Sequence, residues 1–122
     1  MTNPFQDQTN FMRACDQTTD QYNINQFIMY IKLIEEEVKE LREAIDNNNE
    51  TETLDALVDI LVVTIGAINS IGADAEGAWK EVMQTNFAKI NSETGKVLKR
   101  EDGKVLKPEG WQAPNLKQFL HK

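Results

Sequence analysis

The sequence is poor in the residues that form cross-links or bind soft metals, because its 122 residues include one cysteine, Cys15, and one histidine, His121. A single cysteine excludes an internal disulfide and is typical of a reducing compartment. We expect Cys15 to be a small core residue, since nothing near it in the sequence would lower the pKa of its thiol. A di-iron helical bundle needs two Glu-x-x-His motifs. His121, expected to be solvated near the end of the chain, cannot supply them.

Long apolar runs and basic residues are also scarce. No apolar segment reaches membrane-spanning length, and the N-terminus lacks the basic start and apolar stretch of a secretion signal. We therefore expect a cytoplasmic protein that does not contact membranes. The net charge of −7 argues against nucleic acid as a partner. The charge is uneven, because residues 1–91 hold 6 basic and 16 acidic side chains whereas residues 92–122 hold 7 and 4.

The periodicity of apolar residues predicts an all-α protein. The length indicates one domain, residues 1–122, with a helical body at 1–91 and a basic tail at 92–122. A short helix is expected at about 4–16, and apolar residues at steps of three and four predict a long one at about 25–45. A third helix should follow Asn49 as its N-cap and stop near Gly72, and a fourth should begin after Asp74. The third is apolar almost all round, so we expect it to be buried on most sides.

The tail, residues 92–122, predicts a mostly irregular segment. Pro108, Gly110 and Pro114 argue against a long helix. The sequence GKVLK occurs at 95–99 and again at 103–107, and Asp102-Gly103 between the two copies indicates a small hairpin. Apolar residues in the tail suggest that it is strapped over the body or over a partner subunit.

Acidic residues gather on the second and third predicted helices. At about 100° per residue, Glu36, Glu37 and Glu40 share one side of their helix, and Asp55 and Asp59 lie about 40° apart on the next. The simplest alternative is a solvated face with pairs such as Lys32–Glu36 or Glu35–Lys39. Asp55 could equally be favoured by the helix dipole, and Glu52 could be a capping residue rather than a ligand.

Asp59 is the hardest of these carboxylates to explain as a surface residue. Its neighbours are apolar, and no lysine or arginine occurs between Arg42 and Lys80. A desolvated carboxylate either takes up a proton, here beside Asp55, or finds a cation. Ligands that are all oxygen favour Mg²⁺, or Mn²⁺, over Zn²⁺. Because Mg²⁺ sites often include substrate phosphate, the pattern points to phosphoryl chemistry on a nucleotide.

Two stretches of the sequence resemble a known superfamily. Glu36-Glu37-Val-Lys-Glu40-Leu, followed by Asp55-Ala-Leu-Val-Asp59-Ile-Leu-Val, is similar to the E-E-x-x-E and E-x-x-D signature of the MazG-like all-α nucleotide pyrophosphohydrolases. That superfamily also includes dimeric dUTPases and phosphoribosyl-ATP pyrophosphohydrolases. The resemblance covers most of residues 25–116. It implies a four-helix MazG-like bundle that forms homodimers or homotetramers.

The second half of the signature departs from the pattern. Glu52-Thr-Leu-Asp55 matches E-x-x-D literally, yet the apolar run that usually follows the aspartate comes after Asp59. We favour Asp59 as the family's aspartate, with Asp55 in place of the glutamate expected at Ala56. The number of metal ions, one or two, is left open by this substitution.

The resemblance implies an enzyme that hydrolyses a nucleoside triphosphate, a dNTP or a non-canonical NTP, to the monophosphate and pyrophosphate. Mg²⁺ or Mn²⁺ would be held by Glu37, Glu40 and Asp59, with Asp55 as a further ligand. Glu36 and Glu37 are the candidate catalytic residues, and Glu36 would orient or deprotonate the water. The substrate would be bound by residues near and within the tail: Asn86, Lys89, Lys104 and Lys107.

Two other functions remain compatible with the sequence. One is a non-catalytic helical module whose acidic face binds a basic partner. The other is a phosphoribosyl-ATP pyrophosphohydrolase-type enzyme, which we rank lower because the tail is long and basic and no second catalytic domain is present.

Overall fold

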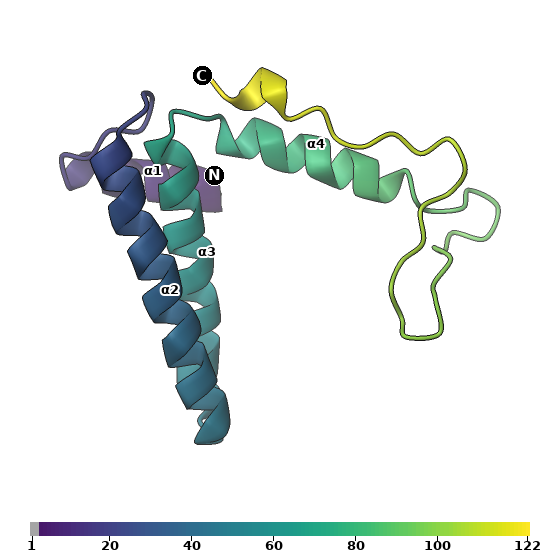
Figure 1. Ribbon diagram of the computed structural model, residues 1–122, viewed down its shortest axis with the longest axis horizontal. Helices are drawn as coiled ribbons and strands as arrows, with labels where there is room; N and C mark the ends of the chain where they lie inside the picture. Colours follow the sequence, from purple (N-terminus) through teal and green to yellow (C-terminus); the bar gives the residue numbers. More distant parts are fainter. Residues whose placement is uncertain (1–2) are drawn as a thin grey trace. The chain divides into compact units, whose positions relative to one another are not determined.

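The computed structural model describes residues 3–122, which form four α-helices and one short 3₁₀ helix (Figure 1). The helices are α1 (Pro4–Ala14), α2 (Ile24–Asp46), α3 (Glu50–Ser70) and α4 (Ala75–Phe87), followed by η1 (Lys117–Phe119). The all-α prediction is confirmed. The chain divides into two compact units, of which one contains α1 to α3 together with Leu120–Lys122 and the other spans Glu76–Phe119.

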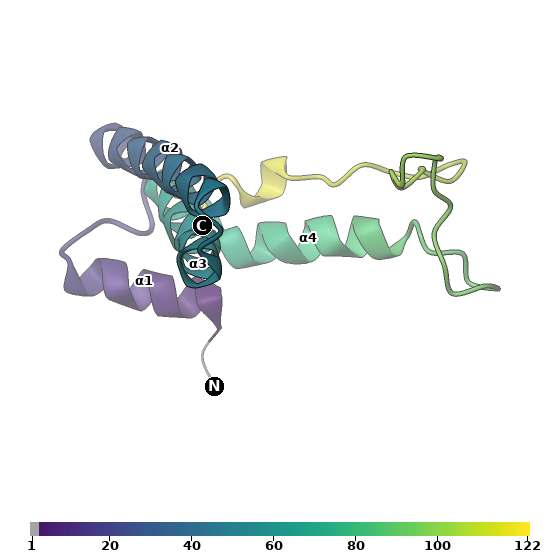
Figure 2. The same ribbon diagram turned by 90° about the horizontal axis from the view of Figure 1, so that it is seen from below.

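In the first unit, α2 and α3 form a helical hairpin and lie side by side along their length (Figures 1 and 2). Asn23 and Asn49 begin the two helices, and each side-chain oxygen accepts a hydrogen bond of 3.1 Å from a backbone N–H of the first turn. The predicted N-cap at Asn49 is therefore confirmed. Between the helices Asn48 has a φ of 54°, a left-handed conformation that asparagine tolerates better than most residues.

The core of this unit lies where α1 meets the hairpin. Met12, Tyr30 and Ala67 are buried against one another, and partly buried residues surround them: Phe27, Ile31, Leu33, Ile34 and Val63. Asn69, also buried, donates hydrogen bonds to Thr9 Oγ1 at 3.1 Å and to Met12 Sδ at 3.4 Å. These bonds satisfy a polar group that would otherwise be costly to bury.

Gly66 lets the ring of Tyr30 approach the backbone of α3. A Cβ at this position would lie 2.7 Å from Tyr30 Cζ and closer still to Cε1 and Cδ1. Alanine normally stabilises a helix interior by about 0.5–1 kcal/mol relative to glycine. We expect the opposite sign for Gly66→Ala, a loss of about 1–3 kcal/mol in the free energy of unfolding, because the ring is overpacked.

Urea unfolding would measure this loss. In a Tyr30→Leu background the same substitution should cost less, since the ring that meets the new methyl group is gone. A Gly66→Ala variant at least as stable as the parent protein would contradict the close packing described here.

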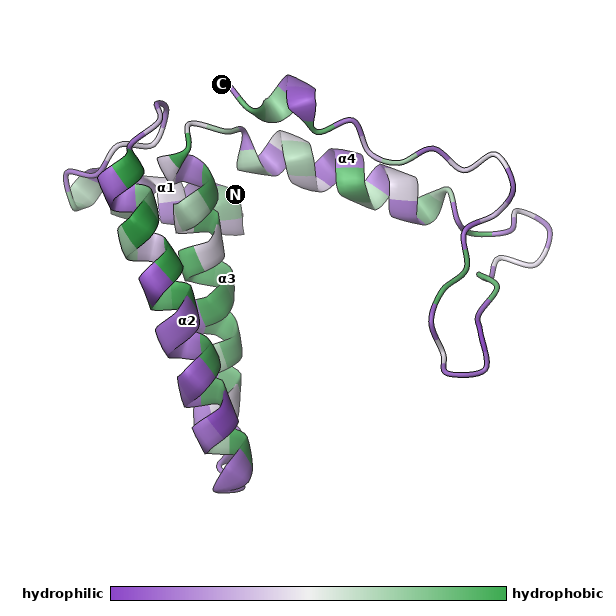
Figure 3. Ribbon diagram, in the orientation of Figure 1, coloured by the Kyte–Doolittle hydropathy of each residue, from purple (hydrophilic) through white to green (hydrophobic). Residues whose placement is uncertain are grey.

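Two expectations about burial are wrong. Cys15 is exposed rather than part of the core, because α1 ends at Ala14 and Cys15 is its C-cap. The third helix, which is largely hydrophobic along its length (Figure 3), is not buried on most sides. Four of its large apolar side chains are 47–64% exposed in the single chain: Leu54, Leu57, Val58 and Leu61. These four residues, called the α3 apolar face below, lie within one side of the helix by its 3.6-residue period.

In the second unit, the predicted hairpin is present. Lys99 and Val105 form an antiparallel bridge, and Leu106 N donates to Leu98 O at 2.8 Å, so the two GKVLK copies pair with each other. Gly103, with a φ of +89°, makes the turn. Asp102 accepts a hydrogen bond of 2.6 Å from Arg100 Nη2, and bonding to Arg100 and to the backbone of Lys104 lowers the pKa of Asp102.

After the hairpin, the chain runs back along α4 (Figure 1). Trp111 Nε1 donates to the backbone oxygen of Thr85 at 2.7 Å, and the backbone N–H of Asn115 donates to Glu81 Oε2 at 2.8 Å. The tail therefore packs on α4 of its own chain. None of the helices found in residues 3–122 combines the length and the apolar character that a membrane crossing requires.

Candidate functional site

The five carboxylates singled out in the sequence lie on the facing helices of the α2–α3 hairpin and are called the acidic cluster here: Glu36, Glu37, Glu40, Asp55 and Asp59. Glu36, Glu40 and Asp55 are exposed, whereas Glu37 and Asp59 are half-buried. The charges of both aspartates on α3 act on Glu37 of α2, so the hairpin brings the two acidic faces together as the sequence predicts.

Glu37 is the most constrained member of the acidic cluster. Its Oε2 atom has no solvent contact and no hydrogen-bond partner. Burial raises the pKa of Glu37, and the charges of Glu40, Asp59 and Asp55, together with a hydrogen bond to Glu40, raise it further. A carboxylate oxygen in this position is stabilised by a proton or by a cation.

Asp59 shows the same behaviour on α3. Burial is the largest of the causes that raise the pKa of Asp59, and the charge of Asp55 and a hydrogen bond to Asp55 add to it. Across residues 3–122 the ion pairs are Lys80–Glu76 and Arg100–Asp102, so no basic side chain neutralises the acidic cluster. The pairs with Lys32 and Lys39 that a purely solvated face would favour are therefore not formed.

The donor set of the acidic cluster fits a hard divalent cation. Within the described part of the chain, no three Asp, Glu, Cys or His side chains already lie in a geometry that would enclose a metal ion. Mg²⁺, however, is usually bound by one or two carboxylates with water and substrate phosphate completing the shell. The pairs Glu37–Glu40 and Asp55–Asp59 and the unpartnered Glu37 Oε2 offer oxygen donors of the kind that such a site uses.

Glu52 lies in the first turn of α3, where its backbone is capped by Asn49. Its backbone N–H donates to Asn49 Oδ1 at 3.1 Å, and its side chain is exposed in the first turn of α3. It is not among the groups that shift the pKa of Glu37 or Asp59. The backbone N–H of Asn49 donates to Ala44 O at 2.9 Å, so the Glu52 side chain does not complete a capping box.

The predicted substrate-binding residues lie in the second unit, where three of the four are brought together. Lys89 Nζ donates to Asn86 Oδ1 at 3.1 Å and lies 4.9 Å from the centroid of the Trp111 ring. Lys107 Nζ lies 5.1 Å from the same centroid. Lys104 is exposed on the hairpin, where its backbone N–H donates to Asp102, and it does not join this group.

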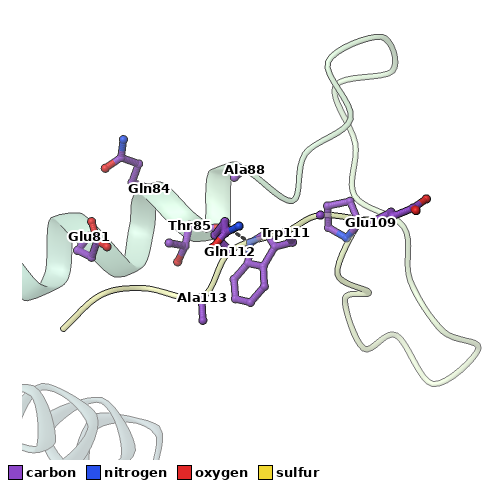
Figure 4. Close-up of a pocket in the computed structure, with 10 residues that line it drawn as sticks. Glu81, Gln84, Thr85, Ala88, Glu109, Trp111, Gln112 and Ala113 are labelled. Atoms are coloured by element: carbon purple, nitrogen blue, oxygen red, sulfur yellow. Dashed lines mark hydrogen bonds between the residues drawn. The ribbon is translucent and has the colours of Figure 1, made fainter. Parts of the chain in front are cut away.

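A cavity of about 570 Å³ adjoins Trp111 (Figure 4). It is lined by α4 on one side and by the returning tail on the other: Glu81, Gln84, Thr85, Ala88 and residues 108–113. Its size falls within the range of small-molecule sites. No local pattern in the sequence predicts this cavity, because it forms where an irregular segment meets residues of α4 that lie well before it in the chain.

A helical hairpin with facing acidic clusters in an all-α chain defines the MazG-like class of nucleotide pyrophosphohydrolases. The profile of one family in that class, phosphoribosyl-ATP pyrophosphohydrolase, matches residues 8–86, and the chain belongs to this family. A search of curated proteins finds no match. Family membership supports a nucleotide pyrophosphohydrolase activity. The match contains the whole acidic cluster and Asn86 but ends before Lys89, Lys104 and Lys107.

Proposed function

We propose that this protein hydrolyses a nucleoside triphosphate between its α and β phosphates and releases the monophosphate and pyrophosphate. The observation that carries the proposal is the buried, unpartnered oxygen of Glu37, which lies near three other carboxylates, Glu40, Asp55 and Asp59, and forms no ion pair. A purely structural role would favour an ion pair at this position, because repulsion within the acidic cluster opposes folding.

The residues of the acidic cluster divide into two roles. Glu37, Glu40 and Asp59 would hold a divalent cation, Mg²⁺ or Mn²⁺, with Asp55 as a further ligand. Such a cation, when bound, neutralises triphosphate charge and polarises the attacked phosphoryl group. Glu36, which is exposed on α2, would orient the attacking water or accept its proton.

Asn86, Lys89, Lys104 and Lys107 supply the polar and positive groups that phosphate binding needs. The acidic cluster by itself repels a triphosphate. Lysine is a compact cation that binds phosphate as a point charge. These four residues are therefore proposed to contact the substrate.

Two substrate classes share this chemistry. One class is a dNTP or a non-canonical NTP, and the other is a phosphoribosyl-ATP. In both, the bond that is hydrolysed is the anhydride between the α and β phosphates. The family whose profile matches residues 8–86 is compatible with the second as well as the first. Either substrate would be used in the cytoplasm.

We also propose that the active form is a homodimer or homotetramer. Leu54, Leu57, Val58 and Leu61 form an apolar face on α3 that the single chain leaves largely exposed. Contiguous exposed apolar surface commonly marks a protein interface. A second copy of this chain is the partner that we propose for it.

An assay of pyrophosphate release tests the proposed activity. The purified protein is incubated with a panel of dNTPs, modified NTPs and phosphoribosyl-ATP, each with Mg²⁺, with Mn²⁺ and with EDTA. We expect release with at least one member of the panel and its loss in EDTA. Mn²⁺ binding, followed by electron paramagnetic resonance without substrate, should be lost in Asp59→Asn.

Each result has a clear meaning. Absence of release with every nucleotide would favour a non-catalytic module whose acidic face binds a basic partner. Release that is unchanged in EDTA would refute the role given to the carboxylates. Normal Mn²⁺ binding by Asp59→Asn would remove Asp59 from the ligand set.

A further inference from the structure

Two ammonium groups lie against one aromatic ring in the second unit, which is an unusual arrangement of like charges. Lys89 Nζ is 4.9 Å and Lys107 Nζ is 5.1 Å from the centroid of Trp111. Because each nitrogen lies within 5.1 Å of the ring centroid, the distance between the two nitrogens is at most twice 5.1 Å. Like charges at such separations repel. The negative face of an indole ring offsets this repulsion by attracting each cation, and tryptophan does so best among the aromatic residues.

The ring that holds the two lysines is itself fixed to α4. Trp111 Nε1 donates to the backbone oxygen of Thr85 at 2.7 Å (Figure 4), and the Trp111 backbone N–H donates to Pro108 O at 3.1 Å. Lys89 has a second restraint, because its Nζ also donates to Asn86 Oδ1 at 3.1 Å. The positions of both ammonium groups therefore depend on the last turns of α4 and on the place of the indole ring.

The two ammonium groups are not neutralised by acidic side chains. Among residues 3–122, the carboxylates that form ion pairs are Glu76 and Asp102, and neither pairs with Lys89 or Lys107. Lys89 also lines a hollow of about 100 Å³ beside the hairpin, together with Ala88, Leu98, Leu106 and Pro108. Two cations without acidic partners, one of which lines this hollow, are suited to an anion that carries several charges.

We infer that Trp111 is a positioning residue, which holds Lys89 and Lys107 as a preformed pair that binds the polyphosphate chain of the nucleotide. The inference rests on the proposed function for the identity of the anion. Ordering a free lysine costs side-chain entropy, about 1.5–2 kcal/mol for full ordering. Lysines already held against the ring lose less of it on binding, so the ring raises affinity through preorganisation.

Spectroscopy of the free protein tests the first half of this inference. In lysine labelled with ¹³C, the Hε protons of Lys89 and Lys107 should show upfield ring-current shifts. Lys89→Arg and Lys107→Arg variants assign the two signals. The shifts should persist in Trp111→Phe and disappear in Trp111→Leu. Both variants lose the hydrogen bond to Thr85, so the comparison isolates the aromatic ring.

Binding of inorganic tripolyphosphate, measured by calorimetry without metal, tests the second half. We expect Lys89→Gln, Lys107→Gln and Trp111→Leu each to weaken binding about tenfold, with Trp111→Phe close to the parent protein. Lys96→Gln is the matched control, because it removes the same charge from the same segment at a residue that does not contact the ring. The two lysine signals should move during the titration.

The outcomes separate this inference from the proposed function. Tripolyphosphate binding that depends on Trp111, in a protein that hydrolyses no nucleotide, would support the lysine pair and refute the enzyme. Hydrolysis together with unaltered tripolyphosphate binding by Trp111→Leu would support the enzyme and overturn the role of Trp111. Lysine signals without ring-current shifts would also overturn it.

Discussion

Glu37→Gln is expected to lower pyrophosphate release by at least about a hundredfold, because loss even of groups that only support a metal ligand costs 10–100-fold. The substitution keeps the size of the side chain and removes the charge. It acts at the atom that is buried and unpartnered in this structure. Initial rates at saturating Mg²⁺, with whichever nucleotide the panel identifies, would measure the loss.

Glu35→Gln is the matched control for this experiment. Glu35 is exposed on the same helix and is not among the groups that shift the pKa of Glu37 or Asp59. Its variant removes one negative charge from α2 and should keep near-normal activity. A Glu37→Gln enzyme as fast as Glu35→Gln would show that Glu37 is neither a ligand nor a catalytic group.

Glu37→Gln, which is expected to lower activity, should raise the stability of the metal-free protein. A raised pKa in the folded state means that folding favours the protonated form of Glu37. Between the ordinary pKa of 4.5 and the raised value, stability therefore falls as pH increases, and the charged form remains unfavourable at neutral pH. Without metal at pH 7, Glu37→Gln should melt at a higher temperature than the parent protein. The advantage should shrink as pH falls below 5 and when Mg²⁺ is added.

Leu61→Glu is expected to dissociate the proposed oligomer, with an increase of at least about a hundredfold in the dissociation constant. Leu61 is 60% exposed in the single chain and belongs to the α3 apolar face. In an interface between two copies, the new carboxylate would be buried without a partner, which is strongly unfavourable. Light scattering coupled to size-exclusion chromatography would report the change in mass.

Asn25→Glu is the control for Leu61→Glu. It adds the same charge at an exposed polar position of α2. It should leave the mass in solution unchanged, and both variants should retain the helical circular dichroism of the parent protein. If Leu61→Glu has the same mass as Asn25→Glu at micromolar concentration, the α3 apolar face is not the interface.

Local sequence signals were sufficient for the helices and for the hairpin of the tail. Asn49 begins α3 because its short side chain can cap the first turn, and Asp102-Gly103 turns the tail because glycine accepts a positive φ. These effects act within a few residues, so they can be read without knowing the rest of the fold. The acidic faces of α2 and α3 could be predicted for the same reason.

Features that depend on distant parts of the chain could not be predicted. The periodicity places Leu57 and Leu61 on one face of a helix. It does not show whether other parts of the same chain cover that face. The residues around Cys15 in the sequence give no reason to expect a reactive thiol, but they do not show that the helix stops one residue before it and leaves it exposed. Trp111 meets Lys89 only because an irregular tail folds back on α4, and no local rule sets the path of such a segment.

The last residue of the chain is hydrogen-bonded to the first unit. Lys122 donates from its backbone to Gly72 and from its ammonium group to Thr19 and Asn69, while residues 92–119 of the tail belong to the second unit. The segment that carries Lys89, Lys104 and Lys107 is therefore joined to the first unit at both of its ends. Two attachments restrict the motion of a segment more than one attachment does. Three hydrogen bonds of one residue, Lys122, therefore fix the C-terminal end of the segment that carries these lysines.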